Sequence, residues 1–100
     1  MIVRIFHGWT TPEHARAYEE FVLETIFPAI RELDGCLGAE LARRDVGDEV
    51  EYVAITQFAD LDAVRRFAGD DYERAVVEPR AQELLSRFDE HSAHYETVDS

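Results

Sequence analysis

The sequence predicts an α+β fold, in which an antiparallel four-stranded sheet carries helices on one of its faces. Four segments rich in β-branched and aromatic residues predict the strands, at residues 2–9, 36–44, 51–58 and 90–98. Between them, apolar residues recur every three or four positions, which is the period of amphipathic helices. The acidic stretch 45–49 separates the second and third strand segments, so these two are expected to form a hairpin.

The first strand segment carries large apolar side chains on both of its faces. Side chains alternate along a strand, so one face carries Val3, Ile5, His7 and Trp9, and the other carries Ile2, Arg4, Phe6 and Gly8. We assign the face of His7 to the helices. Because both faces carry large apolar groups, we expect both to be covered in the folded protein.

A long amphipathic helix is predicted to follow the first strand. Thr11 is its expected N-cap and Pro12 its first residue, and the apolar stripe runs over residues 15–33. Pro28 lies inside this stripe and lacks the amide hydrogen that a helix interior uses. We therefore expect the helix to be kinked or interrupted near residues 24–27.

The second half of the chain predicts two shorter helices and the last strand. Asp60 is a suitable N-cap for the first of these helices, and Gly69 is its expected left-handed stop. Pro79 suits the first turn of the next helix, whose apolar spacing continues to Phe88. The last strand is expected within residues 90–98.

The predicted order of elements is β-α-β-β-α-(α)-β, which is the split βαβ or ferredoxin-like arrangement. Such a sheet has helices on one face only, and in a monomer the other face meets water and is polar. Here the first and third strands are apolar on both faces, so we expect a homodimer in which a second copy closes a shared barrel. A length of 100 residues predicts a single domain over residues 1–100.

Composition restricts the partners and the compartment. Ten basic and 22 acidic residues give a formal net charge of −12, so phosphate backbones and anionic membrane surfaces repel the chain. Neither nucleic acid nor a membrane is therefore an expected partner, and we see neither a signal peptide nor an apolar stretch of membrane length. Cys36 is the single cysteine, which excludes an intrachain disulfide and favours a reducing, cytoplasmic location.

Several stretches of the chain resemble the antibiotic-biosynthesis-monooxygenase-like dimeric α+β barrels. They are Asp34-Gly35 followed by Leu37-Gly38-Ala39, Ile55-Thr56-Gln57-Phe58-Ala59-Asp60-Leu61, Phe67-Ala68-Gly69-Asp70-Asp71-Tyr72 and His94-Tyr95-Glu96. The resemblance covers nearly the whole chain and implies that fold. The family includes cofactor-free oxygenases of quinols and polyketides, haem-degrading enzymes and members of unknown role, so the fold does not select the function.

Haem degradation and metal binding are both disfavoured. The haem-degrading branch of the family uses an Asn, a Trp and a proximal His, and the matching positions here are His7, Phe67 and Val77. Val77 cannot ligate iron. His91 and His94 lie on opposite faces of a strand and lack accompanying ligands, so no metal site is expected. No Gly-rich phosphate loop occurs either, and no cofactor is expected.

The predicted reaction site is an aromatic cleft that contains a histidine. A deprotonated phenol or hydroquinone can itself give an electron to O₂, so the protein needs to supply a base or donor, apolar walls and exclusion of water. His7 is the candidate base because the pKa of histidine lies near neutrality, and Tyr72 is the candidate donor. The candidate substrate contacts are Trp9, Phe58, Phe67 and His94. Ordinary core packing explains such aromatic residues equally well.

Charged residues crowd the same part of the chain. Four arginines and four acids are interspersed between Arg65 and Arg80. One of these arginines could meet an anionic substrate group or stabilise an enolate. We favour the interpretation that they form solvated ion pairs with the acids on helix surfaces.

Two functions stay open. The first is a cofactor-independent monooxygenase that acts on a small aromatic substrate of the quinol or polyphenol type. The alternative is a non-catalytic dimer of the same fold that binds a small hydrophobic molecule in the cleft or has a structural role.

Overall fold

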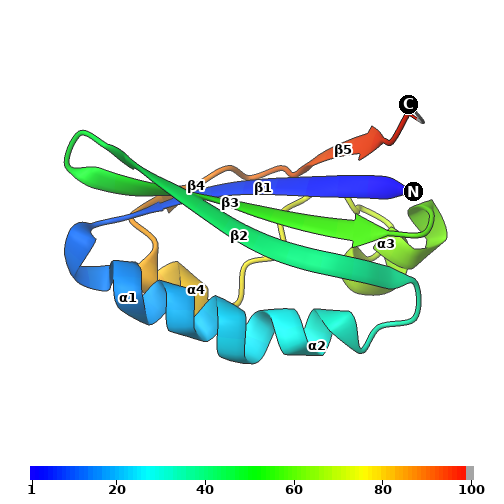
Figure 1. The fold of residues 1–100 in the computed structure, drawn as a ribbon, viewed down its shortest axis with the longest axis horizontal. Helices are drawn as coiled ribbons and strands as arrows, with labels where there is room; N and C mark the ends of the chain where they lie inside the picture. The colour runs from blue at the N-terminus through cyan, green and yellow to red at the C-terminus, as the bar shows by residue number, and fades with distance from the viewer. Residues whose placement is uncertain (99–100) are drawn as a thin grey trace.

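A computed structural model describes residues 1–98, and it places one sheet against a layer of helices (Figure 1). The elements are β1 (Ile2–Thr10), α1 (Pro12–Phe21), the π-helix η1 (Val22–Ile26), α2 (Phe27–Arg31), β2 (Cys36–Val46), β3 (Glu49–Phe58), α3 (Leu61–Ala68), α4 (Pro79–Leu84), β4 (Arg87–Phe88) and β5 (Ala93–Glu96). All strand pairs are antiparallel. The predicted α+β, ferredoxin-like fold is confirmed.

The sheet has the order β2-β3-β1, and both β4 and β5 pair with the free edge of β1. The prediction of one last strand over residues 90–98 was therefore wrong in its detail. Between β4 and β5 the chain leaves β1 and bonds to the loop before α4. The Ala75 amide donates to the Glu90 carbonyl at 2.8 Å, and the Ser92 amide donates to the Glu73 carbonyl at 2.7 Å. Phe88, predicted to belong to the preceding helix, lies in β4.

The long helix is interrupted where Pro28 predicts it. Helix α1 passes into the π-helix η1 and then into α2, whose second residue is Pro28. A wider turn before the proline accommodates its ring and its missing amide hydrogen. The three segments run under the sheet as one rod (Figure 1) and bury Tyr18, Val22 and Phe27. No helix within residues 1–98 is long and apolar enough to span a membrane.

The register of β1 and β3 decides which residues face the helices. Arg4 pairs with Thr56 and Phe6 with Ala54, and Arg4 is only 3% exposed beneath the helix layer. Since side chains alternate, His7 points away from the helices. The predicted alternation of β1 is confirmed, but the assignment of His7 to the helix side was wrong. The reason is that a charged residue, Arg4, occupies the buried face.

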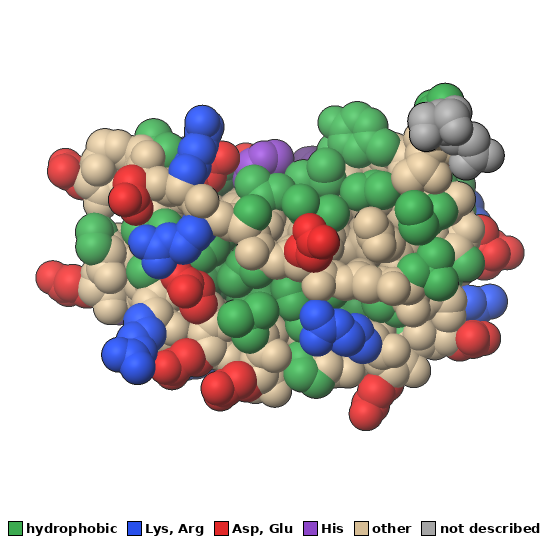
Figure 2. All heavy atoms as spheres, in the orientation of Figure 1, with side chains coloured by type: hydrophobic (Ala, Val, Ile, Leu, Met, Phe, Trp, Pro, Cys, Tyr) green, Lys and Arg blue, Asp and Glu red, His purple; other side chains and the backbone are tan. Residues whose placement is uncertain are grey.

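The face without helices, here called the open face, is apolar in its centre. It carries Val3, Ile5, His7 and Trp9 from β1, Val53 and Ile55 from β3, and Ala93 and Tyr95 from β5. Tyr95 is exposed, and the β1 and β3 side chains are half-buried. In Figure 2, hydrophobic side chains gather over the strands in the middle of the view, whereas many acids and arginines lie around its margins.

Candidate functional site

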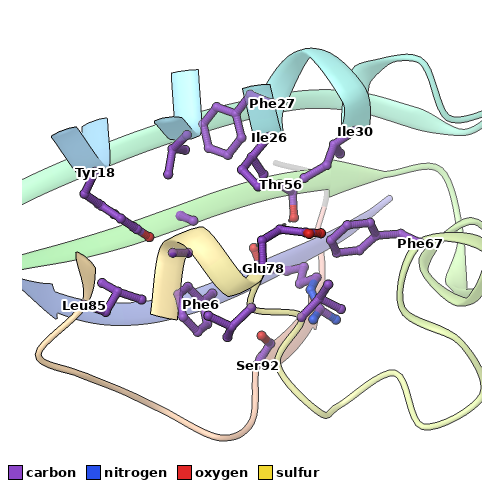
Figure 3. Close-up of a pocket in the computed structure, with 16 residues that line it drawn as sticks. Phe6, Tyr18, Ile26, Phe27, Ile30, Thr56, Phe67, Glu78, Leu85 and Ser92 are labelled. Atoms are coloured by element: carbon purple, nitrogen blue, oxygen red, sulfur yellow. Dashed lines mark hydrogen bonds between the residues drawn. The ribbon is translucent and has the colours of Figure 1, made fainter. Parts of the chain in front are cut away.

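A cavity of about 70 Å³ lies between the helix layer and the sheet, and we call it the inner cavity (Figure 3). Its apolar lining consists of Phe6, Tyr18, Val22, Ile26, Phe27, Ile30, Ala54, Phe67, Val76, Val77, Ala81 and Leu85. Its polar lining consists of Arg4, Thr56, Glu78 and Ser92. Aromatic walls with a few converging polar groups are typical of small-molecule sites.

A second depression adjoins the inner cavity, and we call it the entrance groove. It has a volume of about 360 Å³ and is lined in part by Thr25, Ala29 and Leu33 of the long helix. It shares four lining residues with the inner cavity, which are Ile26, Ile30, Phe67 and Glu78. These shared residues lie where the inner cavity and the entrance groove adjoin, and we call this boundary the passage.

Arg4 forms the sheet side of the inner cavity as a buried cation. Its Nη1 donates to the Tyr72 carbonyl at 2.6 Å and its Nη2 donates to the Arg74 carbonyl at 3.3 Å. Its guanidinium lies over the Phe67 ring, 5.3 Å from the centroid. Burial lowers the pKa of Arg4 to about 10, so the group remains charged at neutral pH. No carboxylate among residues 1–98 forms an ion pair with it.

His94 lies against the outer side of Arg4. Its Nε2 is 3.0 Å from Nη1 of Arg4, and because a guanidinium only donates, Nε2 is the acceptor and the ring proton is on Nδ1. Burial, followed by the charge of Arg4, lowers the pKa of His94, which keeps the imidazole neutral at pH 7. The Tyr72 ring meets the His94 ring edge-on at 5.1 Å. Tyr72 and His94 thus support Arg4 and do not line the inner cavity.

Three buried hydroxyl groups lie at the inner cavity. Thr56 donates its own to the Arg4 carbonyl at 3.5 Å, which leaves those of Ser92 and Tyr18. Ser92 is 5% exposed, and its Oγ has no hydrogen-bond partner within residues 1–98. The strand break between β4 and β5 places it there. Tyr18 directs its ring inward from α1 (Figure 3), and burial raises the pKa of its phenol to about 12. Both groups can donate a proton to a bound oxygen atom.

Glu78 is the acid of the passage. It precedes α4 as the N-cap, yet its side chain forms no capping hydrogen bond. In Figure 3 its carboxylate is directed towards Phe67 instead of towards the helix. The site therefore holds a buried cation on the sheet side and an exposed carboxylate at the entrance.

The six residues predicted for the site separate into four groups. Phe67 alone lines the inner cavity. Phe58 is completely buried and stacks on Phe67 at a centroid distance of 6.0 Å, so it belongs to the core. Tyr72 and His94 lie beside Arg4 at the edge of the sheet, as described above.

His7 and Trp9 form the fourth group and lie on the open face. Their rings are 6.3 Å apart, the guanidinium of Arg87 lies 3.9 Å from the Trp9 centroid, and His7 Nδ1 is 3.7 Å from Asp89 Oδ2. The predicted cleft in which His7 faces Tyr72 was wrong. Strand alternation places His7 on the open face, whereas Tyr72 lies in the loop between α3 and α4, beside Arg4 and His94.

None of the four polar residues that line the inner cavity was predicted as a site residue. Arg4 had an available signal, because a lone charge in the middle of an apolar strand needs a reason to be there. Glu78 was interpreted as one of many surface acids, although its position directly before Pro79 marks a helix start. Ser92 had no signal, since its burial depends on the break between β4 and β5.

Comparison with known proteins gives one family and a common fold. The profile of the antibiotic biosynthesis monooxygenase family matches residues 1–79, and no curated protein matches the chain significantly. A Deinococcus radiodurans structure named for this family has a TM-score of 0.71 at 17% identity, over 100% of this chain and 95% of the other. The structure of a conserved Methanosarcina mazei protein has a TM-score of 0.72 at 12% identity, over 97% of this chain and 92% of the other. The structure of Mycobacterium tuberculosis Rv0793 has a TM-score of 0.64 at 19% identity, over 100% of this chain and 98% of the other.

Proposed function

The chain belongs to the antibiotic biosynthesis monooxygenase family, and on that premise we propose that it oxidises a small phenol or hydroquinone in the inner cavity. The observation that carries the proposal is the cavity itself. It is lined by aromatic and aliphatic side chains, holds few polar groups and opens at one end into a groove. Because the inner cavity has only about 70 Å³, part of an aromatic molecule bound there would lie in the adjoining entrance groove of about 360 Å³.

The reaction needs no electron source besides the substrate. A hydroquinone that loses a proton gives one electron to O₂, and the superoxide and the ring radical then combine through a new carbon–oxygen bond. Loss of the ring hydrogen as a proton and cleavage of the O–O bond release water and leave a carbonyl. In sum, a hydroquinone and O₂ give a hydroxyquinone and water. One oxygen atom enters the product, the other leaves as water, and the substrate supplies all the electrons.

Glu78 is the residue that we assign to proton removal. It stands where the inner cavity meets the entrance groove, so it can take a proton from the substrate hydroxyl that lies nearest the entrance and pass it to solvent. Phe67 is the aromatic wall that the substrate ring contacts. A catalytic role for His7 stays a prediction, and it requires a second site on the open face.

The open face supports a homodimer of single-domain chains. Its centre is apolar, although in an isolated chain it would meet water. Pairing two copies of this face would bury it and close a shared barrel about a two-fold axis. His7 and Trp9 would then lie at the interface, and the inner cavity would remain on the helix side of each copy.

Oxygen uptake tests the function. A panel of hydroquinones and naphthols is supplied to protein treated with chelator, and uptake is recorded with an oxygen electrode. We expect turnover with at least one member. Glu78→Gln should lower kcat by about a hundredfold, because a positioned base contributes at least that much. Glu83→Gln is the matched control on the same helix, since Glu83 pairs with Arg80 at 3.1 Å outside the cavity.

The results separate the two candidate functions. No uptake across the panel would overturn the monooxygenase proposal. If the same compounds still raised the melting temperature, the non-catalytic ligand-binding function would take its place. Loss of activity in His7→Ala with full activity in Glu78→Gln would move the reaction to the open face.

A further inference from the structure

We propose that Arg4 and Ser92 form a receptor for one ionised hydroxyl oxygen, so that the ligand of the inner cavity binds as a phenolate or enolate. This inference deepens the proposed function, on which it rests for the aromatic body of the ligand. Anion binding is nevertheless a property that can be measured without any turnover.

The first argument is the charge of Arg4. A cation that is 97% buried is costly unless an anion accompanies it, and buried arginines usually have a carboxylate partner. Here the partners within residues 1–98 are two backbone carbonyls and a neutral imidazole. Those three contacts use three of the five N–H groups of a guanidinium, so donors remain for a ligand. An anion in the inner cavity would supply the missing charge.

The second argument is the Ser92 hydroxyl, which is independent of charge. A buried hydroxyl without a partner costs free energy, and such groups need an explanation. The backbone bond from Ser92 to Glu73 fixes the residue at the cavity wall, where the hydroxyl can donate to a ligand oxygen. Thr10 has the same kind of unpaired buried hydroxyl but does not line the inner cavity. It therefore provides a matched control.

The other titratable groups around the cavity indicate where the anion lies. Glu78 carries a negative charge at the entrance and repels an anion there. Tyr18, facing inward from α1, keeps its proton and His94 is neutral, so neither competes for Arg4. The ligand oxygen is thus expected on the sheet side beside Arg4 and Ser92, and the ring is expected towards Phe67 and the passage.

The test is the ionisation of bound 4-nitrophenol, whose visible absorption distinguishes the phenolate from the phenol. Protein is titrated with this compound across a pH series, and the apparent pKa of the bound form is compared with that of the free form. An opposite charge at contact distance lowers a pKa by roughly one to three units, so we expect a decrease of about one unit or more. An unchanged or raised pKa, or no saturable binding, would overturn the receptor.

Variants assign the effect to the two residues. Ser92→Ala should weaken nitrophenolate binding about tenfold, as expected for a lost hydrogen bond to an anion, and should not lower the melting temperature. Thr10→Val should leave binding unchanged. Arg4→Met should abolish the pKa decrease and Arg4→Lys should keep part of it. If Arg4→Met fails to fold, Ser92→Ala decides alone, and equal binding in Ser92→Ala and Thr10→Val contradicts the proposal.

Two further ligands define the anion. We expect 4-nitroanisole, which cannot ionise, to bind more weakly than nitrophenolate and without sensitivity to Ser92→Ala. Benzoate should also bind more weakly than nitrophenolate. Tighter binding of benzoate would mean that the receptor takes a carboxylate and not an ionised hydroxyl, which would overturn the proposal. The two proposals fail separately. If the pKa of bound nitrophenol is lowered but no hydroquinone gives oxygen uptake, the receptor stands and the monooxygenase proposal fails. If uptake occurs and is unaffected by Ser92→Ala, the monooxygenase proposal stands and the receptor fails.

Discussion

Filling the inner cavity with protein should remove its function without unfolding the chain. Ala54 is the position for this change, because it lines the cavity from β3 and pairs with Phe6 on β1. Leucine adds three carbon atoms there. A dry cavity costs about 24 cal/mol per Å³, so complete filling of about 70 Å³ recovers at most ~1.7 kcal/mol. Overpacking acts in the opposite direction by roughly 1–3 kcal/mol.

The expected result for Ala54→Leu is therefore a melting temperature that changes by only a few degrees and a ligand site that is lost. About 1 kcal/mol corresponds to roughly 4–8 °C in a domain of this size. Calorimetry measures the first quantity, and oxygen uptake and nitrophenol binding measure the second. Ala17→Leu is the control, since Ala17 packs beside the core on α1 and does not line the cavity.

One outcome would refute the reasoning about location. If Ala54→Leu melted near the parent protein and still turned over substrate with the parental kcat/KM, the reaction would not take place in the inner cavity. A large decrease in the melting temperature would instead mean that leucine does not fit, and the smaller change Ala54→Val would then be measured in the same way.

Three further predictions concern stability and assembly. Burial raises the pKa of Tyr18 from 10.0 to about 12 in the folded state, so its contribution of about 3 kcal/mol is present below pH 10 and is lost by about pH 12. Tyr18→Phe should therefore show that much less alkaline destabilisation in urea titrations than the parent. The lowered pKa of Arg4 has the opposite effect, but it acts on both proteins and cancels in the comparison. Ile55→Glu places a charge in the centre of the open face and should convert a dimer into a monomer in sedimentation experiments, whereas a parent protein that sediments as a monomer would contradict the dimer. Asp60 accepts from the Ala63 amide at 2.9 Å, so Asp60→Ala should cost about 1 kcal/mol in chemical denaturation, and Asp60→Asn should cost less.

The backbone preferences of single residues and their neighbours were sufficient to predict most of the fold. Pro28 predicted the interruption that appears as η1, and Asp60 and Gly69 predicted both ends of α3. The hairpin was predicted as well, although its turn is tighter than expected because Gly47 adopts a φ of +58° between β2 and β3. Each of these features depends on the backbone preferences of a few neighbouring residues, which a sequence displays directly.

The candidate site could not be predicted to the same extent, because it depends on which sheet face is buried. Alternation along β1 separates His7 from Arg4, but it does not say which of them faces the helices. A histidine beside apolar residues was the more usual choice for the buried side, and burial of an arginine is rare. Tertiary contacts decided otherwise. The Tyr72 and Arg74 carbonyls receive the guanidinium, and their position depends on a loop that residues 90–92 hold in place.

The fate of the oxygen atoms tests the central claim most directly. Chelator-treated protein is supplied with isotopically labelled O₂ and the best hydroquinone of the panel, and the product is analysed by mass spectrometry. We predict that one labelled atom enters each product molecule, that the other is found in water, and that Ala54→Leu abolishes the incorporation. A product without label, or the same incorporation in Ala54→Leu, would contradict a monooxygenase reaction in the inner cavity.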